Sequence, residues 1–246
     1  MLELYHDWDS FYSFKVRFCL AEKRLDWQGH RIDLLAFENL RPDYLKLNPN
    51  GVVPTLVHDG ALIVESSVIN EYLDEVFPEP ALKPADAKGR ARMRALVKYQ
   101  DDVAYWAQRP AAFQLLIKQK LARFSKAEID ALMQGHPDPQ RAQSFLSVAG
   151  VPVDMSVVAD SRHKIVAVFD RLERALGQGP WLMGAEFTLA DAAYASFIDR
   201  LEWLRFEDLW RDRPALAAWV ARLKARPSFA KAQSPAEFRL PRPQAA

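Results

Sequence analysis

Residues 50–73, NGVVPTLVHDGALIVESSVINEYL, contain a proline, a glutamate and two serines at positions where they do not stabilise a sheet. Pro54 has no backbone N–H to donate to a neighbouring strand, so it belongs at the first residue of a strand or on a sheet edge. Glu65, Ser66 and Ser67 follow an apolar strand and directly precede a helical pattern. A bound ligand would explain both placements, although a serine there is also an ordinary helix N-cap.

The other reactive side chains form no recognisable catalytic or metal-binding pattern. Cys19 is the only cysteine, so we expect neither a disulfide framework nor a C-x-x-C pair for redox chemistry. Its place on an apolar helical stretch predicts packing in the core. The five histidines show no metal-ligand spacing, so no metal is expected.

Charge and hydropathy argue against two classes of partner. The 33 basic and 32 acidic side chains give a net charge of +1, which does not favour nucleic-acid binding or general attraction to a membrane surface. No apolar run approaches the ~20 residues needed to span a membrane. The chain also begins without a basic segment followed by an apolar one. With the single cysteine, these features predict a cytoplasmic protein.

The first third of the chain alternates strand-like and helical patterns. Asp59-Gly60 separates two apolar runs and predicts a hairpin turn. A strand, helix and parallel strand followed by a hairpin and a closing helix is the order of a thioredoxin-like α/β domain, predicted over residues 1–80. Strands are expected at 2–6, 28–34, 55–59 and 61–65, helices at 12–24 and 66–77, and a short helix or turn at 41–49.

The strand pattern ends at a proline-rich linker, residues 81–89, and an all-helical domain is expected over 90–235. Pro110 should bend or break its first long helix. Thr188 and Asp191 have capping-box spacing and should start a later helix. The other expected segments are an insertion around 120–160 with a loop-rich part at 136–154, helices at 161–178 and 213–225, and a tail at 236–246 that is frayed over RLPRPQAA, residues 239–246.

Three motifs together resemble the cytosolic glutathione S-transferase superfamily over nearly the whole chain. They are SFYSFKVRF at 10–18, NPNGVVPTL with IVESSVINEYL at 48–73, and FTLADAAYASFID at 187–199. The insertion is similar to that of the bacterial branch with glutathione-dependent β-aryl etherases and tetrachlorohydroquinone dehalogenase. The resemblance implies an α/β thioredoxin-like N-terminal domain followed by an all-α C-terminal domain.

The resemblance also implies that glutathione binds the first domain as a co-substrate. The Val53-Pro54 bond should be cis, a minority state of X–Pro bonds, with the Val53 backbone facing the cysteinyl part. Glu65 should pair with the γ-glutamyl ammonium group, while Ser66 and a helix N-terminus receive its carboxylate. Asn39 matches a position that contacts the glycine end in zeta-like relatives, and it is equally suited to a turn.

Chemistry in this family requires a thiolate. A free thiol has a pKa of ~8.5, and lowering it by ~2 units corresponds to ~2.7 kcal/mol, the scale of a hydrogen bond to an anion plus a helix dipole. Ser10 and Ser13 are the candidate hydroxyls at the start of the first helix. Ser10 matches the serine of zeta- and phi-like members and is preferred, whereas Ser13 matches theta-like and β-etherase-like members. Either one is also a suitable N-cap.

Tyr12 departs from the S-x-C-S pattern of the zeta-like isomerases and the dehalogenase, which places a cysteine there. Chemistry that requires this cysteine is therefore disfavoured. Tyr12, Tyr105, Trp106 and Phe113 are candidates to line a substrate pocket, although an aromatic stripe is also typical of a core.

The resemblance implies a glutathione transferase that attacks a hydrophobic, aromatic electrophile, with β-aryl ether cleavage as the preferred case. The alternatives are a non-catalytic interaction module of the same fold and a zeta-type isomerase or dehalogenase. A homodimer is expected, in which Asp101 or Asp102 either reaches the partner's glutathione or remains on a solvated helix surface. Roles in detoxification and aromatic compound degradation would follow.

Overall fold

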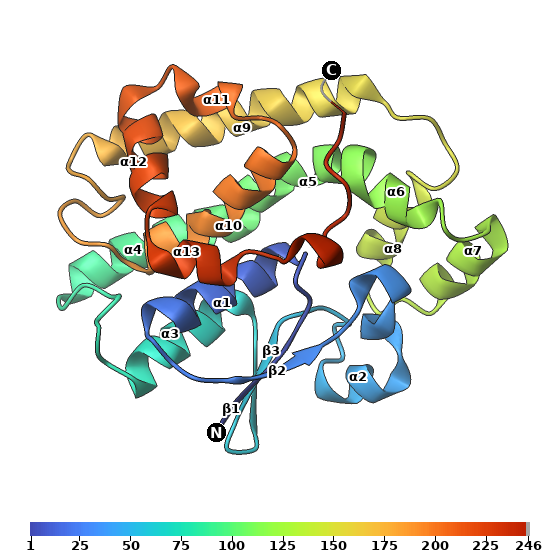
Figure 1. Cartoon of the computed structure of the whole chain (residues 1–246), viewed down its shortest axis with the longest axis horizontal. Helices are drawn as coiled ribbons and strands as arrows, with labels where there is room; N and C mark the ends of the chain where they lie inside the picture. Colours follow the sequence, from blue (N-terminus) through green and yellow to red (C-terminus); the bar gives the residue numbers. More distant parts are fainter. Residues whose placement is uncertain (245–246) are drawn as a thin grey trace.

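The computed structural model describes residues 1–244 and places a small sheet beside a larger helical domain (Figure 1). The strands are β1 Leu2–His6, β2 Gln28–Arg31, β3 Thr55–His58 and β4 Ala61–Val64, in the spatial order β2-β1-β3-β4. β1 runs parallel to β2 and antiparallel to β3, and β3 pairs with β4 as a hairpin. The predicted thioredoxin-like order is confirmed.

The connections follow from the strand directions. Parallel strands need a long crossover, and helix α1 (Phe11–Glu22) supplies it between β1 and β2. The hairpin needs only Asp59 and Gly60, whose φ angles of 49° and 85° suit a tight turn. Helix α3 (Ser66–Val76) then closes the domain against α1. The β2–β3 connection contains the 3-10 turns η1 Leu34–Ala36 and η2 Glu38–Leu40 and the short helix α2 Pro42–Leu47.

A helical run with two π turns crosses the second domain. Its parts are α4 Ala87–Tyr99, η3 Gln100–Ala104, α5 Tyr105–Ala112, η4 Phe113–Ile117 and α6 Lys118–Leu121. Pro110 lies inside α5 without breaking it. The Ala111 N–H, next to the proline, donates to Ser161 Oγ at 3.2 Å, and the wider π turn follows directly. The expected break is therefore replaced by a local change of helix type.

The insertion is helical. Helices α7 (Lys126–Gln134) and α8 (Pro139–Leu146) occupy it, so the prediction of a loop-rich segment at 136–154 is wrong for α8. The Asp138 side chain accepts hydrogen bonds from the first N–H groups of α8, and Pro139 fits the first helical position. A satellite core joins the insertion to the β2–β3 connection through Phe37, Phe113, Leu121, Ile129, Met133, Ala142 and Val148.

Helix α10 (Leu189–Trp203) forms the centre of the second domain, and its residues 189–201 are all buried. The predicted capping box is present: Thr188 Oγ1 accepts from the Ala190 N–H, and Asp191 Oδ2 accepts from the Thr188 N–H. Helix α1 packs against α10 and against α13, and these contacts join the two domains (Figure 1). The surrounding helices are α9 Met155–Leu176, α11 Asp208–Arg211, α12 Pro214–Lys224 and α13 Pro227–Ala232.

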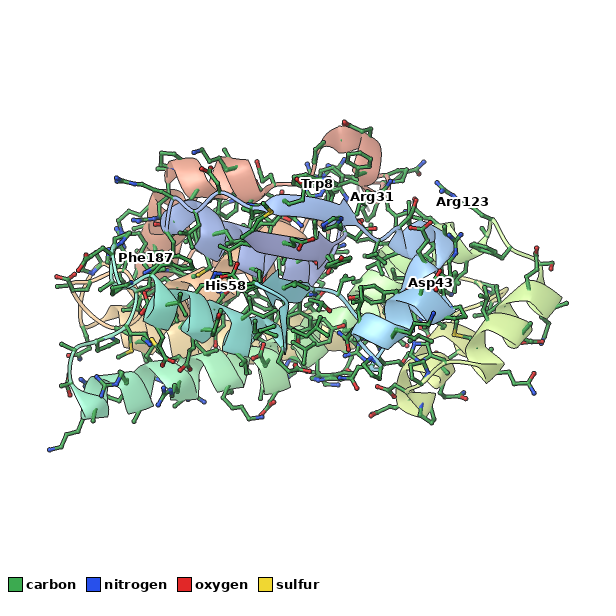
Figure 2. All side chains as sticks on the ribbon, turned by 90° about the horizontal axis from the view of Figure 1, so that it is seen from below. Trp8, Arg31, Asp43, His58, Arg123 and Phe187 are labelled. Carbon is green, nitrogen blue, oxygen red and sulfur yellow. The ribbon has the colours of Figure 1, made fainter. Side chains whose placement is uncertain are left out.

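The C-terminal segment packs on both domains, so the expectation of a frayed end is wrong for residues 239–243; residues 245 and 246 lie outside the described part. It contains the 3-10 turn η5 (Ala236–Phe238). Figure 2 shows Trp8 and Arg31 of the first domain beneath this segment, where both contact the Phe238 ring. Leu240 is buried, and its carbonyl oxygen accepts a hydrogen bond from Trp203 Nε1 at 2.9 Å. Within residues 1–244, every helix is too short or too polar to cross a membrane.

Candidate active site

A cavity of about 610 Å³ lies between the loops of the first domain and the helical run of the second. This volume is within the range of small-molecule sites. Ser13 and Trp106 are not among its lining residues. The sequence-predicted residues that line it are Ser10, Tyr12, Asn39, Val53, Pro54, Glu65, Ser66, Asp101, Asp102, Tyr105 and Phe113.

The two candidate serines face different surroundings. Ser10 is the N-cap of α1, and its Oγ accepts a hydrogen bond from the Ser13 N–H at 3.2 Å. Because that bond uses only a lone pair, the Ser10 hydroxyl hydrogen remains available to a ligand in the cavity. The Ser13 side chain is fully buried, and its Oγ has no hydrogen-bond partner in the described part of the chain. Only Ser10 therefore presents its hydroxyl to the cavity.

The loop between β1 and α1 is held from several sides. The Asp7 carboxylate accepts hydrogen bonds from the N–H groups of Leu34 at 2.8 Å and Asp9 at 2.9 Å. Burial raises the pKa of Asp7. Arg17 donates to the Asp7 carbonyl oxygen at 2.9 Å, and Arg200 of α10 donates to Asp9 Oδ1 at 3.0 Å. These contacts fix the backbone that leads into Ser10.

The loop before β3 carries the predicted backbone site. The Val53–Pro54 bond is cis, which confirms that prediction. The preceding carbonyl oxygen, of Val52, accepts hydrogen bonds from Tyr44 Oη at 2.7 Å and Asn48 Nδ2 at 2.8 Å. Residues at the end of α2 thus hold the loop in place, and Val53 and Pro54 line the cavity.

Glu65 and Ser66 stand where β4 leads into α3. Glu65 has φ 69° and ψ 110°, uncommon for a residue other than glycine, and its side chain makes no capping hydrogen bond. Ser66 begins α3, whose first N–H groups have no partner within the helix. A carboxylate beside a helix N-terminus fits a ligand end with both an ammonium and a carboxylate group. Asn39 donates to the Gly51 carbonyl oxygen at 2.7 Å, and its buried Oδ1 has no partner within residues 1–244.

A buried lysine lies beside the N-terminus of α3, and the sequence analysis did not identify it. Lys15 Nζ in α1 donates to Ser67 Oγ at 2.5 Å and to Asp101 Oδ1 at 2.9 Å. Burial lowers the pKa of Lys15, and the nearby Asp101 carboxylate opposes that shift. Asp101 is therefore paired within its own chain, and Asp102 pairs with Lys98 at 2.6 Å. The sequence feature that could have identified Lys15 is its position inside the apolar pattern of the first helix.

Aromatic side chains also line the cavity. The Tyr12 and Tyr105 ring centroids lie 4.7 Å apart. Burial raises the pKa of Tyr12, so its hydroxyl stays protonated and can donate a hydrogen bond. The ring centroids of Phe113 and Phe145 of α8 lie 5.1 Å apart, and Phe145 also lines the cavity. Trp106 is 38% exposed and lies outside the lining, so the structure does not bring it to this site.

Sequence reasoning missed many of the other lining residues, among them Gln108, Arg109, Lys120 and Leu240. Gln108, Arg109 and Lys120 lie in helices, and the helix face that borders a cavity depends on how the insertion and the C-terminal segment pack against it. Among residues 1–244, no group of three or more histidine, cysteine, aspartate or glutamate side chains is placed to hold a metal ion.

Comparisons with known proteins all point to the same protein family. The model of the glutathione S-transferase N-terminal domain matches residues 9–76, and that of the C-terminal domain matches 156–222. Protein LigF of Sphingobium sp. (strain NBRC 103272 / SYK-6) is 31% identical over 236 residues, covering 93% of this chain and 91% of LigF. The crystal structure of that β-etherase aligns with a TM-score of 0.86 at 29% identity, over 94% of this chain and 98% of LigF.

Two other relatives have names that differ in function from that of LigF. Maleylacetoacetate isomerase of Pseudomonas aeruginosa is 43% identical over 98 residues, covering 39% of this chain and 46% of the isomerase. FtsZ-localized protein A of Caulobacter vibrioides is 27% identical over 222 residues, covering 88% of this chain and 84% of that protein. The matches to both domain models and to LigF along most of the chain show that this protein belongs to the glutathione S-transferase family, which uses glutathione as its co-substrate.

Proposed function

We propose that this protein binds glutathione in the cavity, stabilises its thiolate with Ser10, and directs the sulfur at a hydrophobic aromatic electrophile. The observation that carries the proposal is that one cavity is lined by the Ser10 hydroxyl, the Val53-Pro54 backbone, Glu65 with Ser66, and aromatic side chains. Ser10 supplies a hydroxyl donor at the N-terminus of α1, and both the hydrogen bond and the helix dipole favour an anion.

A β-aryl ether is the substrate we prefer. Support comes from the similarity to LigF along most of both chains and from the folded insertion beside the cavity. In such a reaction the glutathione sulfur attacks the carbon that bears the aryl ether oxygen. The new C–S bond forms as the C–O bond breaks, and the electron pair of that bond leaves on the phenolate oxygen.

Two other functions have support from particular relatives. Similarity to FtsZ-localized protein A favours a non-catalytic interaction module, and similarity to maleylacetoacetate isomerase favours a zeta-type isomerase. Tyr12 in place of the family cysteine weighs against the isomerase. The free hydroxyl of Ser10 and the Glu65–Ser66 pair weigh against a module that has lost glutathione binding.

Calorimetry with glutathione followed by turnover assays tests the proposal. We expect saturable glutathione binding and glutathione-dependent release of 4-nitrophenol from a phenacyl 4-nitrophenyl ether, followed by absorbance. Absence of glutathione binding would favour the interaction module. Conversion of a maleyl-type substrate without cleavage of the ether would favour the isomerase.

We also propose that the protein forms a homodimer and acts in the cytoplasm in the breakdown of aromatic compounds. Exposed apolar side chains on β4, α3, η3 and α5 support a partner surface for a second copy: Leu62, Val68, Val76, Val103 and Trp106. Light scattering after size-exclusion chromatography tests the dimer. A Val68→Glu variant should shift the mass towards that of one chain, because a charge opposes burial of this surface.

A further inference from the structure

Lys120 of α6 is a buried cation on the cavity wall. It is 4% exposed and donates a hydrogen bond to the Leu34 carbonyl oxygen. Its Nζ lies 3.3 Å from the centroid of the Phe37 ring and 5.5 Å from that of Phe145. A buried ammonium group normally pairs with a carboxylate, but Asp7 and Asp33 affect Lys120 only through their charge and without a hydrogen bond.

Arg109 is a second buried cation on the same wall. It is 6% exposed, and its buried Nε has no hydrogen-bond partner in the described part of the chain. The guanidinium carbon lies 4.0 Å from the centroid of the Phe113 ring. The rings of Phe113, Phe145 and Phe37 form a continuous row, with neighbouring centroids 5.1 Å and 5.6 Å apart. Two cations therefore flank three phenyl rings.

The acidic residues of the cavity are engaged by other groups or belong to the proposed glutathione site. Asp9 pairs with Arg200, Asp101 with Lys15, and Asp102 with Lys98. The Asp7 carboxylate accepts two backbone hydrogen bonds. Glu65 stands at the N-terminus of α3. His136 and Arg141 also line the cavity near the phenyl row; Asp138, which pairs with Arg141 at 3.2 Å, is not among the lining residues.

Lys120 is connected to the loop that carries Ser10 by a short chain of contacts. Its ammonium group bonds to the Leu34 carbonyl oxygen, and the Leu34 N–H bonds to Asp7. The Asp7 carbonyl oxygen in turn accepts from the Ser10 N–H at 3.3 Å. The cationic aromatic row and the proposed thiolate position therefore share one cavity and one supporting loop.

We propose that Lys120, assisted by Arg109, binds the anionic oxygen of the aryl group that leaves the substrate. This inference rests on the proposed function and deepens it by assigning the side chains that receive the leaving phenolate. The phenyl row provides an apolar wall for the aromatic ring, and a charge-assisted hydrogen bond from Lys120 receives the oxygen.

The proton balance is consistent with this role. As the C–S bond forms and the C–O bond breaks, the electron pair stays on the phenolate oxygen and the ammonium group of Lys120 hydrogen-bonds to it. Burial lowers the pKa of Lys120 to about 7, below that of an ordinary phenol. Lys120 can therefore transfer a proton to the phenolate, giving a neutral phenol and a neutral amine that regains a proton from water.

Spectroscopic titration of 4-nitrophenol with excess protein tests the anion site without turnover. A site that prefers the phenolate should lower the apparent pKa of bound 4-nitrophenol by about one unit, which corresponds to a tenfold preference for the anion. Lys120→Met should abolish the shift, Lys120→Arg should retain most of it, and Arg109→Met should reduce it. The affinity for the phenolate should fall as the pH rises through the pKa of Lys120, because the ammonium group is lost.

Lys118→Met is the matched control. Lys118 lies in the same helix but outside the cavity lining, and it donates to the carbonyl oxygens of Val151 and Pro152. This variant should keep the wild-type shift, and far-ultraviolet circular dichroism should show that all four variants fold. A wild-type shift that persists in Lys120→Met, or no shift in the wild type, would overturn the proposal.

Turnover with a series of aryl ethers gives a second measurement. The loss of kcat/KM in Lys120→Met should grow from about tenfold to about a hundredfold as the leaving phenol becomes less acidic. Conversion of a neutral aryl halide, which releases no phenolate, should fall by a smaller factor, which reflects only the lost support of the loop that carries Ser10. A uniform loss across all substrates would contradict the assignment. The 4-nitrophenol titration needs no glutathione, so a failure to bind glutathione in calorimetry would be seen separately, as failure of the proposed function.

Discussion

Replacing Ser10 by alanine should raise the pKa of bound glutathione. The Ser10 Oγ accepts from the Ser13 N–H and leaves its hydrogen free on the cavity side. A hydrogen bond to a charged group contributes about 1.5–3 kcal/mol. Since one pKa unit corresponds to about 1.4 kcal/mol, the loss should raise the thiol pKa by about one to two units. The dipole of α1 remains in the variant, so part of the thiolate stabilisation should survive.

The pKa is measured from the ultraviolet absorbance of the thiolate as a saturated complex is titrated with base. Ser10→Ala should also lower the free energy of unfolding by about 1 kcal/mol, because the N-cap of α1 is lost. Ser10→Thr keeps a hydroxyl that both caps and donates, so it should restore most of the thiolate and most of the stability. These two readouts separate the role of Ser10 as a helix cap from its role towards sulfur.

Ser13→Ala is the matched control, because its buried hydroxyl has no partner among residues 1–244 and does not line the cavity. The bound-thiol pKa should change by less than about 0.3 units, since the Ser13 N–H that donates to Ser10 is kept. The reasoning is refuted if Ser13→Ala raises the pKa and Ser10→Ala does not. That result would move the activating hydroxyl to Ser13.

Three further changes have expected outcomes. Glu65→Gln should weaken glutathione binding in calorimetry about five- to tenfold, because it removes the proposed partner of the ammonium group; unchanged affinity would argue against that pairing. Asp191→Ala should lower the free energy of unfolding in urea by about 3–5 kcal/mol, because three buried N–H donors, including Trp219 Nε1 at 2.9 Å, lose their acceptor; a loss below about 1 kcal/mol would contradict this. Burial and Arg17 lower the pKa of His6 from 6.5 to about 3, so between these values only the unfolded chain binds the proton. Stability should therefore fall by about 1.4 kcal/mol per pH unit below pH 6, and an equally steep fall in His6→Gln would exclude His6 as the cause.

Local patterns were sufficient for most of the first domain, although the strand expected at 28–34 ends at Arg31 and Leu34 begins a 3-10 turn. Its strands and helices follow from alternating apolar residues, the Asp59-Gly60 turn and Pro54, each of which acts within a few residues. The capping box at Thr188 could be predicted as well, because it also forms between residues close together in the sequence. Predictions failed where a distant segment decided the outcome. Pro110 stays in a helix because Ser161 of α9 accepts the neighbouring N–H.

The same distinction divides the candidate site. Ser10, Val53, Pro54, Glu65 and Ser66 lie at turns and helix starts, so a motif was enough to identify them as candidates. Lys120 and Arg109 were missed because nothing local marks a lysine or arginine in a polar helix as buried. Their burial comes from the satellite core, in which Phe37 of the first domain meets the insertion. Trp106 was proposed for its type alone, and its helix turns that side chain away from the cavity.

The position of Ser10 depends on the second domain as much as on the first. Asp9, the preceding residue, accepts hydrogen bonds from Arg200 of α10 and from the Leu240 N–H of the C-terminal segment. Arg239 pairs with Asp199 on that helix, which anchors the segment. Because these contacts fix the backbone that leads into α1, the helical domain does more than shape a pocket for the electrophile. It holds the proposed thiolate-stabilising hydroxyl in place, so a change of Asp199 or Arg239, which do not line the cavity, should affect reactivity without any contact to glutathione.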